Sequence, residues 1–111
     1  MTLERSPDLL PGTLDLLILK AGARGPMHGY GIAHHLKQVS DAVLQVGERS
    51  LYPALQRLIL NGHLKPESGL SENNRRARFY TLTASGRKQL AAERAEFDRI
   101  IFAIQRVLAT S

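Results

Sequence analysis

Apolar residues recur at helical spacing along most of this chain. After the helix breakers at 11–12, the leucines and isoleucines of residues 14–21 repeat at intervals of three and four, and Thr13 can cap their start. This spacing predicts a first helix that begins near Thr13. Asp15 and Lys20 are nearly its only polar residues, so the helix needs burial on two sides.

Two more helices are predicted after turns. Glycines and proline in residues 22–26 predict a turn, and a second amphipathic helix starts near Gly29 and ends at 40–41. A third helix begins around Ser50 and stops at 61–62, where Asn-Gly is a common helix terminator. Its leucines lie four and seven residues apart, which places them on one face.

A hairpin and a long helix complete the predicted order. Residues 64–67 and 77–82 flank a polar, glycine-containing tract at 68–76, which is typical of a hairpin with a long loop. Thr83 is well placed to cap the last helix.

The last helix carries more apolar surface than one small domain can bury. From Leu90 onward its apolar residues have near-heptad spacing, and 100–104 is apolar nearly all round. Pairing with a second chain is the economical explanation, and it predicts a homodimer. The residues predicted at this interface are Leu16, Leu19, Phe97, Ile100, Ile101, Ile104 and Leu108.

Composition and charge narrow the function. The chain has 111 residues, 43% of them apolar, which predicts one compact domain. A net charge of +5 favours polyanionic partners, although membrane-surface binders share this property. Arg75, Arg76 and Arg78 concentrate the positive charge.

The chemistry of the remaining residues points away from secretion, membranes and metals. The chain has no cysteine, which suits a reducing cytoplasm and leaves no thiolate ligand. No stretch reaches the ~20 apolar residues of a membrane helix, and the first residues do not form a secretory signal. His34 and His35 are adjacent and point apart on a helix, so a metal site is not expected. We therefore expect a cytoplasmic, soluble protein without cofactor.

Several segments in this order resemble the PadR-like transcriptional regulators. The quoted segments are Gly12-Thr13-Leu14-Asp15-Leu16-Leu17, His28-Gly29-Tyr30-Gly31-Ile32, Ser50-Leu51-Tyr52-Pro53-Ala54-Leu55, and Arg75 to Thr83 with Gly86. They cover about residues 12 to 90. The resemblance implies a mainly helical winged helix-turn-helix fold with a long C-terminal dimerisation helix. Residues 1–82 would be the DNA-binding unit, with its wing at about 63–82, and 83–111 the dimerisation helix of the same compact unit.

In such a fold the third helix enters the major groove of double-stranded DNA. With its leucines turned inward, the other side of this helix can meet bases and phosphates, with Gln56 suited to adenine and Arg57 to guanine or phosphate. Arg49 departs from the small residue, usually glycine, that the family has there. The predicted DNA-binding residues are Tyr30, Arg49, Ser50, Tyr52, Pro53, Gln56, Arg57, Arg75, Arg76 and Arg78.

The resemblance further implies a repressor that binds an inverted-repeat operator and is released by a small hydrophobic or aromatic effector. Two other classes stay open at this point. One is a winged-helix protein interaction module without specific DNA binding, against which the arginine cluster stands. The other is a basic RNA-binding protein, against which we count the lack of exposed aromatic platforms for unpaired bases. An enzyme is the weakest alternative.

Overall fold

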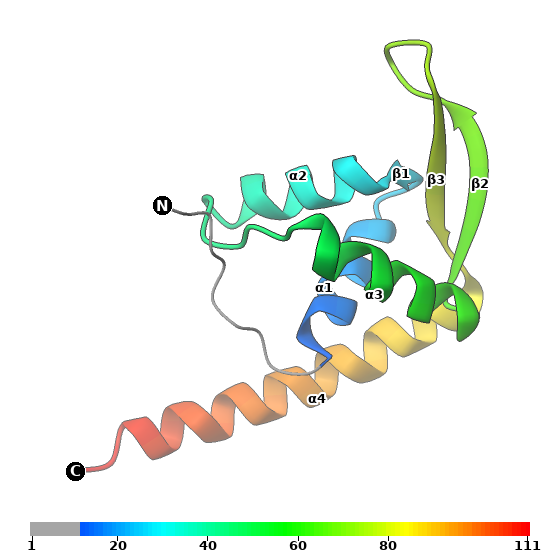
Figure 1. The fold of residues 1–111 in the computed structure, drawn as a ribbon. Helices are drawn as coiled ribbons and strands as arrows, with labels where there is room; N and C mark the ends of the chain where they lie inside the picture. The colour runs from blue at the N-terminus through cyan, green and yellow to red at the C-terminus, as the bar shows by residue number, and fades with distance from the viewer. Residues whose placement is uncertain (1–11) are drawn as a thin grey trace.

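The computed structural model describes residues 12–111 (Figure 1). The described chain starts with three helices: α1 (Thr13–Gly22), α2 (Gly29–Val39) and α3 (Glu48–Leu60). α1 and α2 begin at the predicted residues. α3 begins two residues before Ser50, because Gly47 is its N-cap residue. The features predicted for 1–11 lie outside the described residues.

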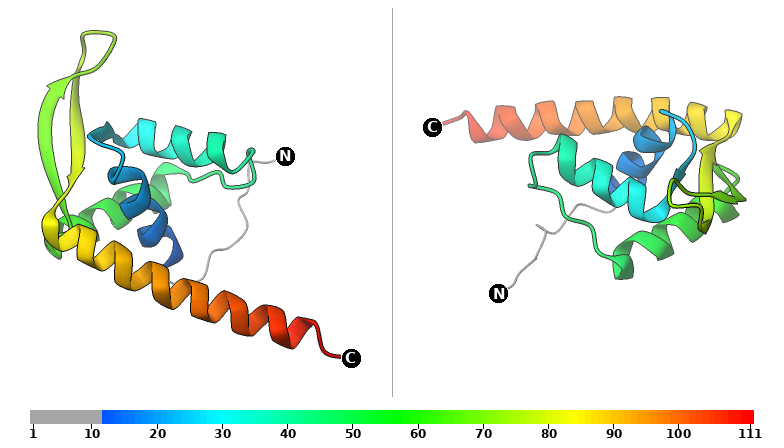
Figure 2. Two further views of the ribbon diagram at one scale, coloured as in Figure 1. Left: turned by 180° about the vertical axis from the view of Figure 1, so that it is seen from behind. Right: turned by 90° about the horizontal axis from the view of Figure 1, so that it is seen from above.

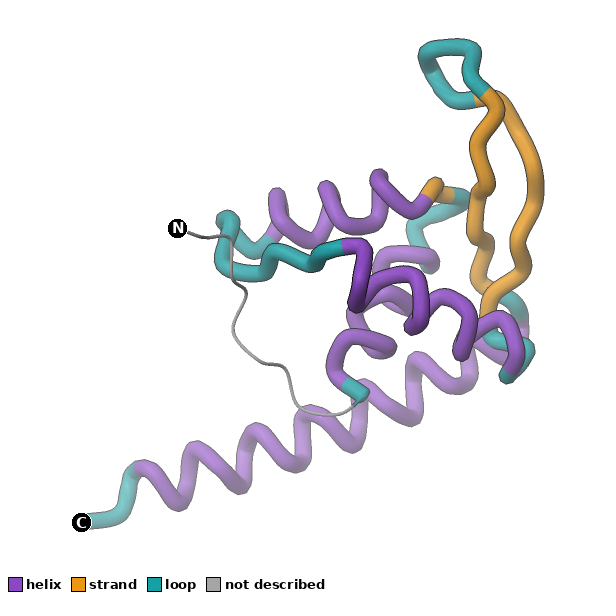
Figure 3. Tube along the Cα trace, in the orientation of Figure 1, coloured by secondary structure: helices purple, strands orange, loops and turns teal. Residues whose placement is uncertain are grey.

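The chain also forms a small antiparallel sheet, whose first strand lies between α1 and α2 in the sequence. Its described strands are β1 (Met27–His28), β2 (Leu64–Leu70) and β3 (Arg76–Leu82), in the order β1-β3-β2. The hairpin was predicted, but β1 was missed, since two residues are too short to show a period. Leu70 pairs with Arg76, so the strands run longer and the loop is shorter than the tract 68–76 suggested. Figure 3 shows the hairpin standing out from the helices.

The last helix, α4 (Ala84–Leu108), is capped as predicted. The Thr83 hydroxyl oxygen accepts a hydrogen bond from the Gly86 N–H at 2.9 Å. The same hydroxyl donates to the Gly62 carbonyl oxygen at 2.6 Å. One side chain thus fastens the start of α4 to the turn between α3 and β2.

The core forms around α1, which packs against α2, α3 and α4 (Figure 2). Its buried aliphatic residues include Ile18, Leu19, Ile32, Leu55 and Leu58. Leu19 was expected at a dimer interface, but its exposed fraction is 0%, so it offers no surface to a second chain. An apolar face on both sides of α1 is explained by this central position.

The second half of α4 extends beyond the other helices (Figures 1 and 2). Its large apolar side chains are exposed: Ile100, Phe102, Ile104, Val107 and Leu108. This surface has no cover within the described chain. Among the described residues, no helix combines the length and apolar character that a membrane crossing requires.

Candidate nucleic-acid interface

One side of α3 faces the core and the other faces solvent. Leu51, Ala54, Leu55 and Leu58 are buried, as the leucine spacing predicted. Arg49, Ser50, Pro53 and Gln56 are exposed. The exposed side therefore carries the groups predicted to contact DNA.

The start of α3 corrects two details of the prediction. The Ser50 N–H donates to the Gly47 carbonyl oxygen at 3.2 Å, so Ser50 lies inside the first turn instead of capping it. Pro53 consequently falls in the second turn. Its ring removes the N–H that would otherwise reach the Arg49 carbonyl, one helical turn back. Ser50 is exposed, and its hydroxyl does not cap the helix.

The ring of Tyr52 lies against the first residue of α2. A β-carbon on Gly29 would be 3.2 Å from the Tyr52 hydroxyl oxygen and 3.3 Å from the ring. Glycine at this position therefore gives the Tyr52 ring space, and its φ is not one that a turn would require. Tyr52 remains 43% exposed, so packing and solvent contact coexist in one side chain.

His28 caps α2, a role that the sequence did not reveal. Its Nδ1 accepts a hydrogen bond from the Gly31 N–H at 2.9 Å, which requires an imidazole unprotonated at that nitrogen. A β-carbon on Gly31 would approach the His28 ring to 3.3 Å, so this glycine also makes room for an aromatic ring. The sequence signal for this close packing was the pair of glycines in the segment 28–31.

An exposed row of rings runs along the start of α2. Tyr30 is 74% exposed. It stacks on His28 at 6.3 Å between centroids and on His34 at 6.1 Å. Our expectation that the chain lacks an exposed aromatic platform was wrong. Tyr30 was predicted only as a DNA contact, and His34 was considered only as a metal ligand, so this stack of rings was not anticipated.

A shallow hollow joins these elements. Its lining residues are His28, Gly29, Tyr30, Tyr52, Gln56, Ala77, Arg78 and Tyr80. Four of the predicted contact residues, from α2, α3 and β3, thus meet around one depression. Tyr80 forms its floor at 4% exposure, and burial raises the pKa of this phenol, partly offset by the charge of Arg78.

The wing arginines lie along β3 and its loop. Arg76 and Arg78 are exposed and two residues apart, so they share the face of β3 that further along carries Tyr80 and Leu82. Arg75 lies in the loop, where the Ser71 N–H donates to its carbonyl oxygen at 2.8 Å. All three arginines are exposed; Arg75 and Arg76 lie at the loop end of the hairpin, whereas Arg78 lines the hollow beside α2 and α3.

Arg57 differs from the other predicted contacts because its side chain forms an ion pair with a carboxylate of another helix. Its Nη2 donates to Asp15 Oδ1 of α1 at 2.8 Å. This hydrogen bond and the carboxylate charge raise the pKa of Arg57, which stays protonated. The Arg57 side chain is 55% exposed and that of Asp15 19%.

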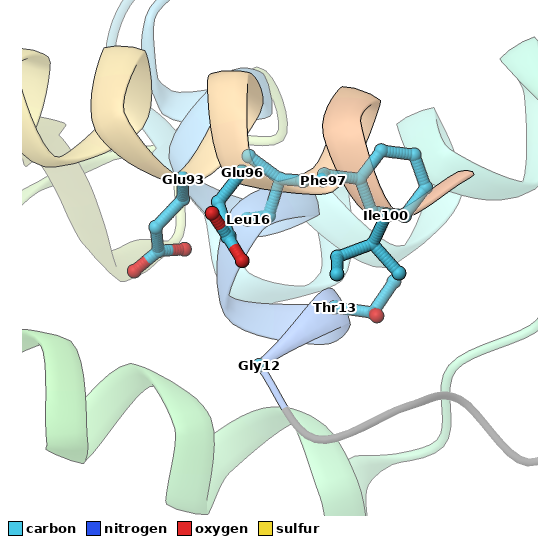
Figure 4. A pocket seen from close by; sticks show the side chains of 7 residues that line it. All are labelled: Gly12, Thr13, Leu16, Glu93, Glu96, Phe97 and Ile100. Carbon is cyan, nitrogen blue, oxygen red and sulfur yellow. The ribbon is translucent and has the colours of Figure 1, made fainter. Parts of the chain in front are cut away.

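An apolar groove lies on the other side of α1, against α4 (Figure 4). Leu16, Phe97 and Ile100 line it, together with the acidic Glu93 and Glu96. Glu93 Oε1 is buried without a hydrogen-bond partner, whereas Oε2 accepts from Gln89. The groove thus combines apolar walls with one unsatisfied acceptor. Among residues 12–111, no group of three histidines and carboxylates could hold a metal ion.

Helices followed by a basic hairpin, with an exposed helix face beside it, define the winged helix-turn-helix class of DNA-binding proteins. The model of the transcriptional regulator PadR-like family matches residues 18–92. The chain belongs to this family, whose members are transcriptional regulators and not enzymes. Its fold is the family's, with the three-stranded sheet and long C-terminal helix described above.

Solved structures of transcriptional regulators agree with this assignment, and a curated protein of uncharacterized function is similar in sequence. A transcriptional regulator from Clostridium thermocellum superimposes with a TM-score of 0.78 at 28% identity, covering 86% of this chain and 92% of the other. A PadR family regulator from Eggerthella lenta gives 0.73 at 26% identity, covering 90% and 85%. An uncharacterized 37.1 kDa protein in transposon TN4556 of Streptomyces fradiae is 38% identical over 77% of this chain. The chain spans only 23% of that protein's length.

Proposed function

We propose that this PadR-like regulator is a homodimeric repressor that binds an inverted-repeat operator through α3 and the wing. The observation that carries the proposal is the convergence of Tyr30, Tyr52, Gln56 and Arg78 around one surface hollow. A recognition helix reads base edges with its N-terminal residues. Arg49, Ser50 and Pro53 are exposed at that end of α3.

Each side chain suits a distinct part of DNA. Gln56 can make paired hydrogen bonds to adenine. Tyr30 and Tyr52 can donate to phosphate, and Arg75, Arg76 and Arg78 can neutralise phosphates along the backbone. The wing therefore supplies affinity, while α3 supplies sequence preference.

The exposed stripe on α4 supports a dimer. Ile100, Ile104 and Leu108 lie on the same side of the helix as Phe97 and are uncovered in the described chain. A contiguous apolar surface of this kind marks an interaction site, and two-fold pairing is the commonest way to cover it. Two recognition helices in such a dimer fit half-sites about one DNA turn apart, or a multiple of that.

The groove between α1 and α4 supports response to a small effector. Its walls suit an apolar or aromatic molecule, and the carboxylates of Glu93 and Glu96 among its lining residues suit a hydroxyl or amine donor on that molecule. Phe97 and Ile100 belong to both the groove and the α4 stripe. A ligand bound there would therefore alter the dimer, and with it the spacing of the recognition helices.

Fluorescence anisotropy with the duplex upstream of the chain's own gene tests the proposal, with a random duplex of equal length as reference. We expect tighter binding to the upstream duplex at each salt concentration. Equal affinity for both duplexes throughout the series would rule out a sequence-specific repressor and favour the interaction module. Tighter binding to a single-stranded RNA would favour the RNA-binding alternative.

Two variants separate the parts of the interface. Changing Arg75 and Arg76 together to alanine should weaken binding to both duplexes and reduce the salt slope by about two per protomer. Tyr52→Phe keeps the ring over Gly29 and removes only the hydroxyl, so its loss of affinity measures that contact. If neither variant weakens operator binding, α3 and the wing do not dock as proposed.

A further inference from the structure

We propose that Arg57 is a positioning residue that fixes the recognition helix α3 to α1 through Asp15, and does not read DNA itself. The inference rests on the proposed function and assigns one of its residues a different task. The carrying observation is the 2.8 Å contact between Arg57 Nη2 and Asp15 Oδ1, which joins residues 42 positions apart in the chain.

The surroundings of the pair favour a lasting contact. Asp15 lies in the first turn of α1 and Arg57 in the last turn of α3, where the helix dipoles favour a negative and a positive charge respectively. The Asp15 side chain is only 19% exposed, so its carboxylate is largely withdrawn from competing water. An arginine moved to a phosphate would leave this partly buried charge without its partner.

α1 contacts both α3 and α4, so its ion pair with α3 can influence how the two helices are placed. On one side the start of α1 lines the groove against α4, through Thr13 and Leu16. On the other side Asp15 holds α3. α1 therefore connects each recognition helix to α4, the proposed dimer helix, and it does so through buried core residues and, at the surface, through this ion pair. Two half-sites can be met together only when both recognition helices keep their orientation.

Removing the carboxylate gives opposite results for the two roles of Arg57. If Arg57 positions α3, Asp15→Asn weakens operator binding. If Arg57 contacts DNA, the same change releases the guanidinium and removes a negative charge, so binding is unchanged or tighter. A partly exposed pair predicts a loss of about two- to fivefold for each protomer, and the product of the two losses for a dimer.

The experiment compares anisotropy titrations of wild type, Asp15→Asn, Arg57→Gln and the double variant, on operator and random duplex across a salt series. We expect both single variants to lose operator preference, and the double variant to lose no more than either. The salt slope on random duplex should stay at the wild-type value. Asp15→Glu keeps the carboxylate acceptor and should bind the operator as the wild type does. Lys20→Gln, on the exposed surface of α1, removes one positive charge as Arg57→Gln does and is the charge control for that variant.

Thermal melts establish that each variant is folded. A variant that loses affinity for both duplexes alike, in proportion to a general loss of folded protein, contradicts the inference. So does an Asp15→Asn chain that binds operator as well as wild type while Arg57→Gln lowers the salt slope. A wild-type chain without operator preference overturns the proposed function and this inference with it, whereas an intact preference unaffected by Asp15→Asn overturns the inference alone.

Discussion

Gly29 shows how much of the interface depends on an absent side chain. Its missing β-carbon leaves room for Tyr52, and that of Gly31 leaves room for His28. Neither glycine has a positive φ. Sequence reasoning could assign these glycines to a turn, because spacing along the chain does not reveal which ring from another element will pack there.

Gly86 permits the closest backbone approach. A β-carbon at this position would overlap the His63 carbonyl oxygen, and backbone cannot swing aside as a flexible side chain can. Alanine has about 1 kcal/mol better helix propensity than glycine, but the overlap outweighs it. We expect Gly86→Ala to lower the free energy of unfolding by about 1–3 kcal/mol in urea denaturation.

Gly47→Ala is the matched control for this experiment. A β-carbon on Gly47 meets nothing within 4 Å. Its φ of −84° is open to any residue. The free energy of unfolding of Gly47→Ala should stay within about 1 kcal/mol of the wild-type value, since only the N-cap residue of α3 changes. A loss for Gly86→Ala no larger than that for Gly47→Ala would show that the contact with His63 does not destabilise the variant.

His35 predicts a fall in stability on acidification. Burial, and next the charge of Arg24, hold the pKa of His35 below its ordinary value of 6.5 in the folded chain. The unfolded chain therefore binds this proton more readily, and stability is lost as the pH falls through about 6.5 toward the lower folded pKa. His35→Gln should flatten the dependence of the urea midpoint on pH over this range.

At the scale of elements, local patterns predicted the repeated elements and the cap of α4, but not the caps of α2 and α3. The helices, the hairpin and the cap at Thr83 followed from periodicity and turn chemistry. β1 did not, because a two-residue strand forms only when β3 offers it a partner. The ion pair of Asp15 with Arg57 was equally invisible, since it depends on two helices that meet only in the folded chain.

Thr83 connects the start of α4 to the turn before β2, and its removal should loosen both. Thr83→Val keeps the shape and removes the oxygen that accepts from Gly86 and donates to Gly62. We expect a loss of about 1–2 kcal/mol in the free energy of unfolding. Thr83→Ser keeps the oxygen and should retain most of the stability. A loss for serine as large as that for valine would mean that the methyl group contributes as much as the cap.

For the molecule as a whole, the proposed dimer depends on the exposed apolar residues in the second half of α4. Ile104 is 40% exposed and lies on the stripe with Phe97 and Leu108. Phe102 is 61% exposed and lies on another side of the helix, where Arg106 covers its ring at 5.8 Å. The two positions are close in sequence and both carry a large apolar side chain, so they form a matched pair for one substitution.

Ile104→Asp should convert the proposed dimer to a monomer at micromolar concentration, measured by light scattering. Two-fold symmetry places the substitution in the interface twice, and each carboxylate would be buried without a partner. Phe102→Asp should leave the mass of the particle unchanged, because that side chain lies off the stripe. Loss of the dimer with Phe102→Asp but not with Ile104→Asp would move the interface to the opposite side of α4. A wild-type chain that is itself monomeric would mean that a different partner covers the stripe, and the paired recognition helices of the operator complex would lose their basis.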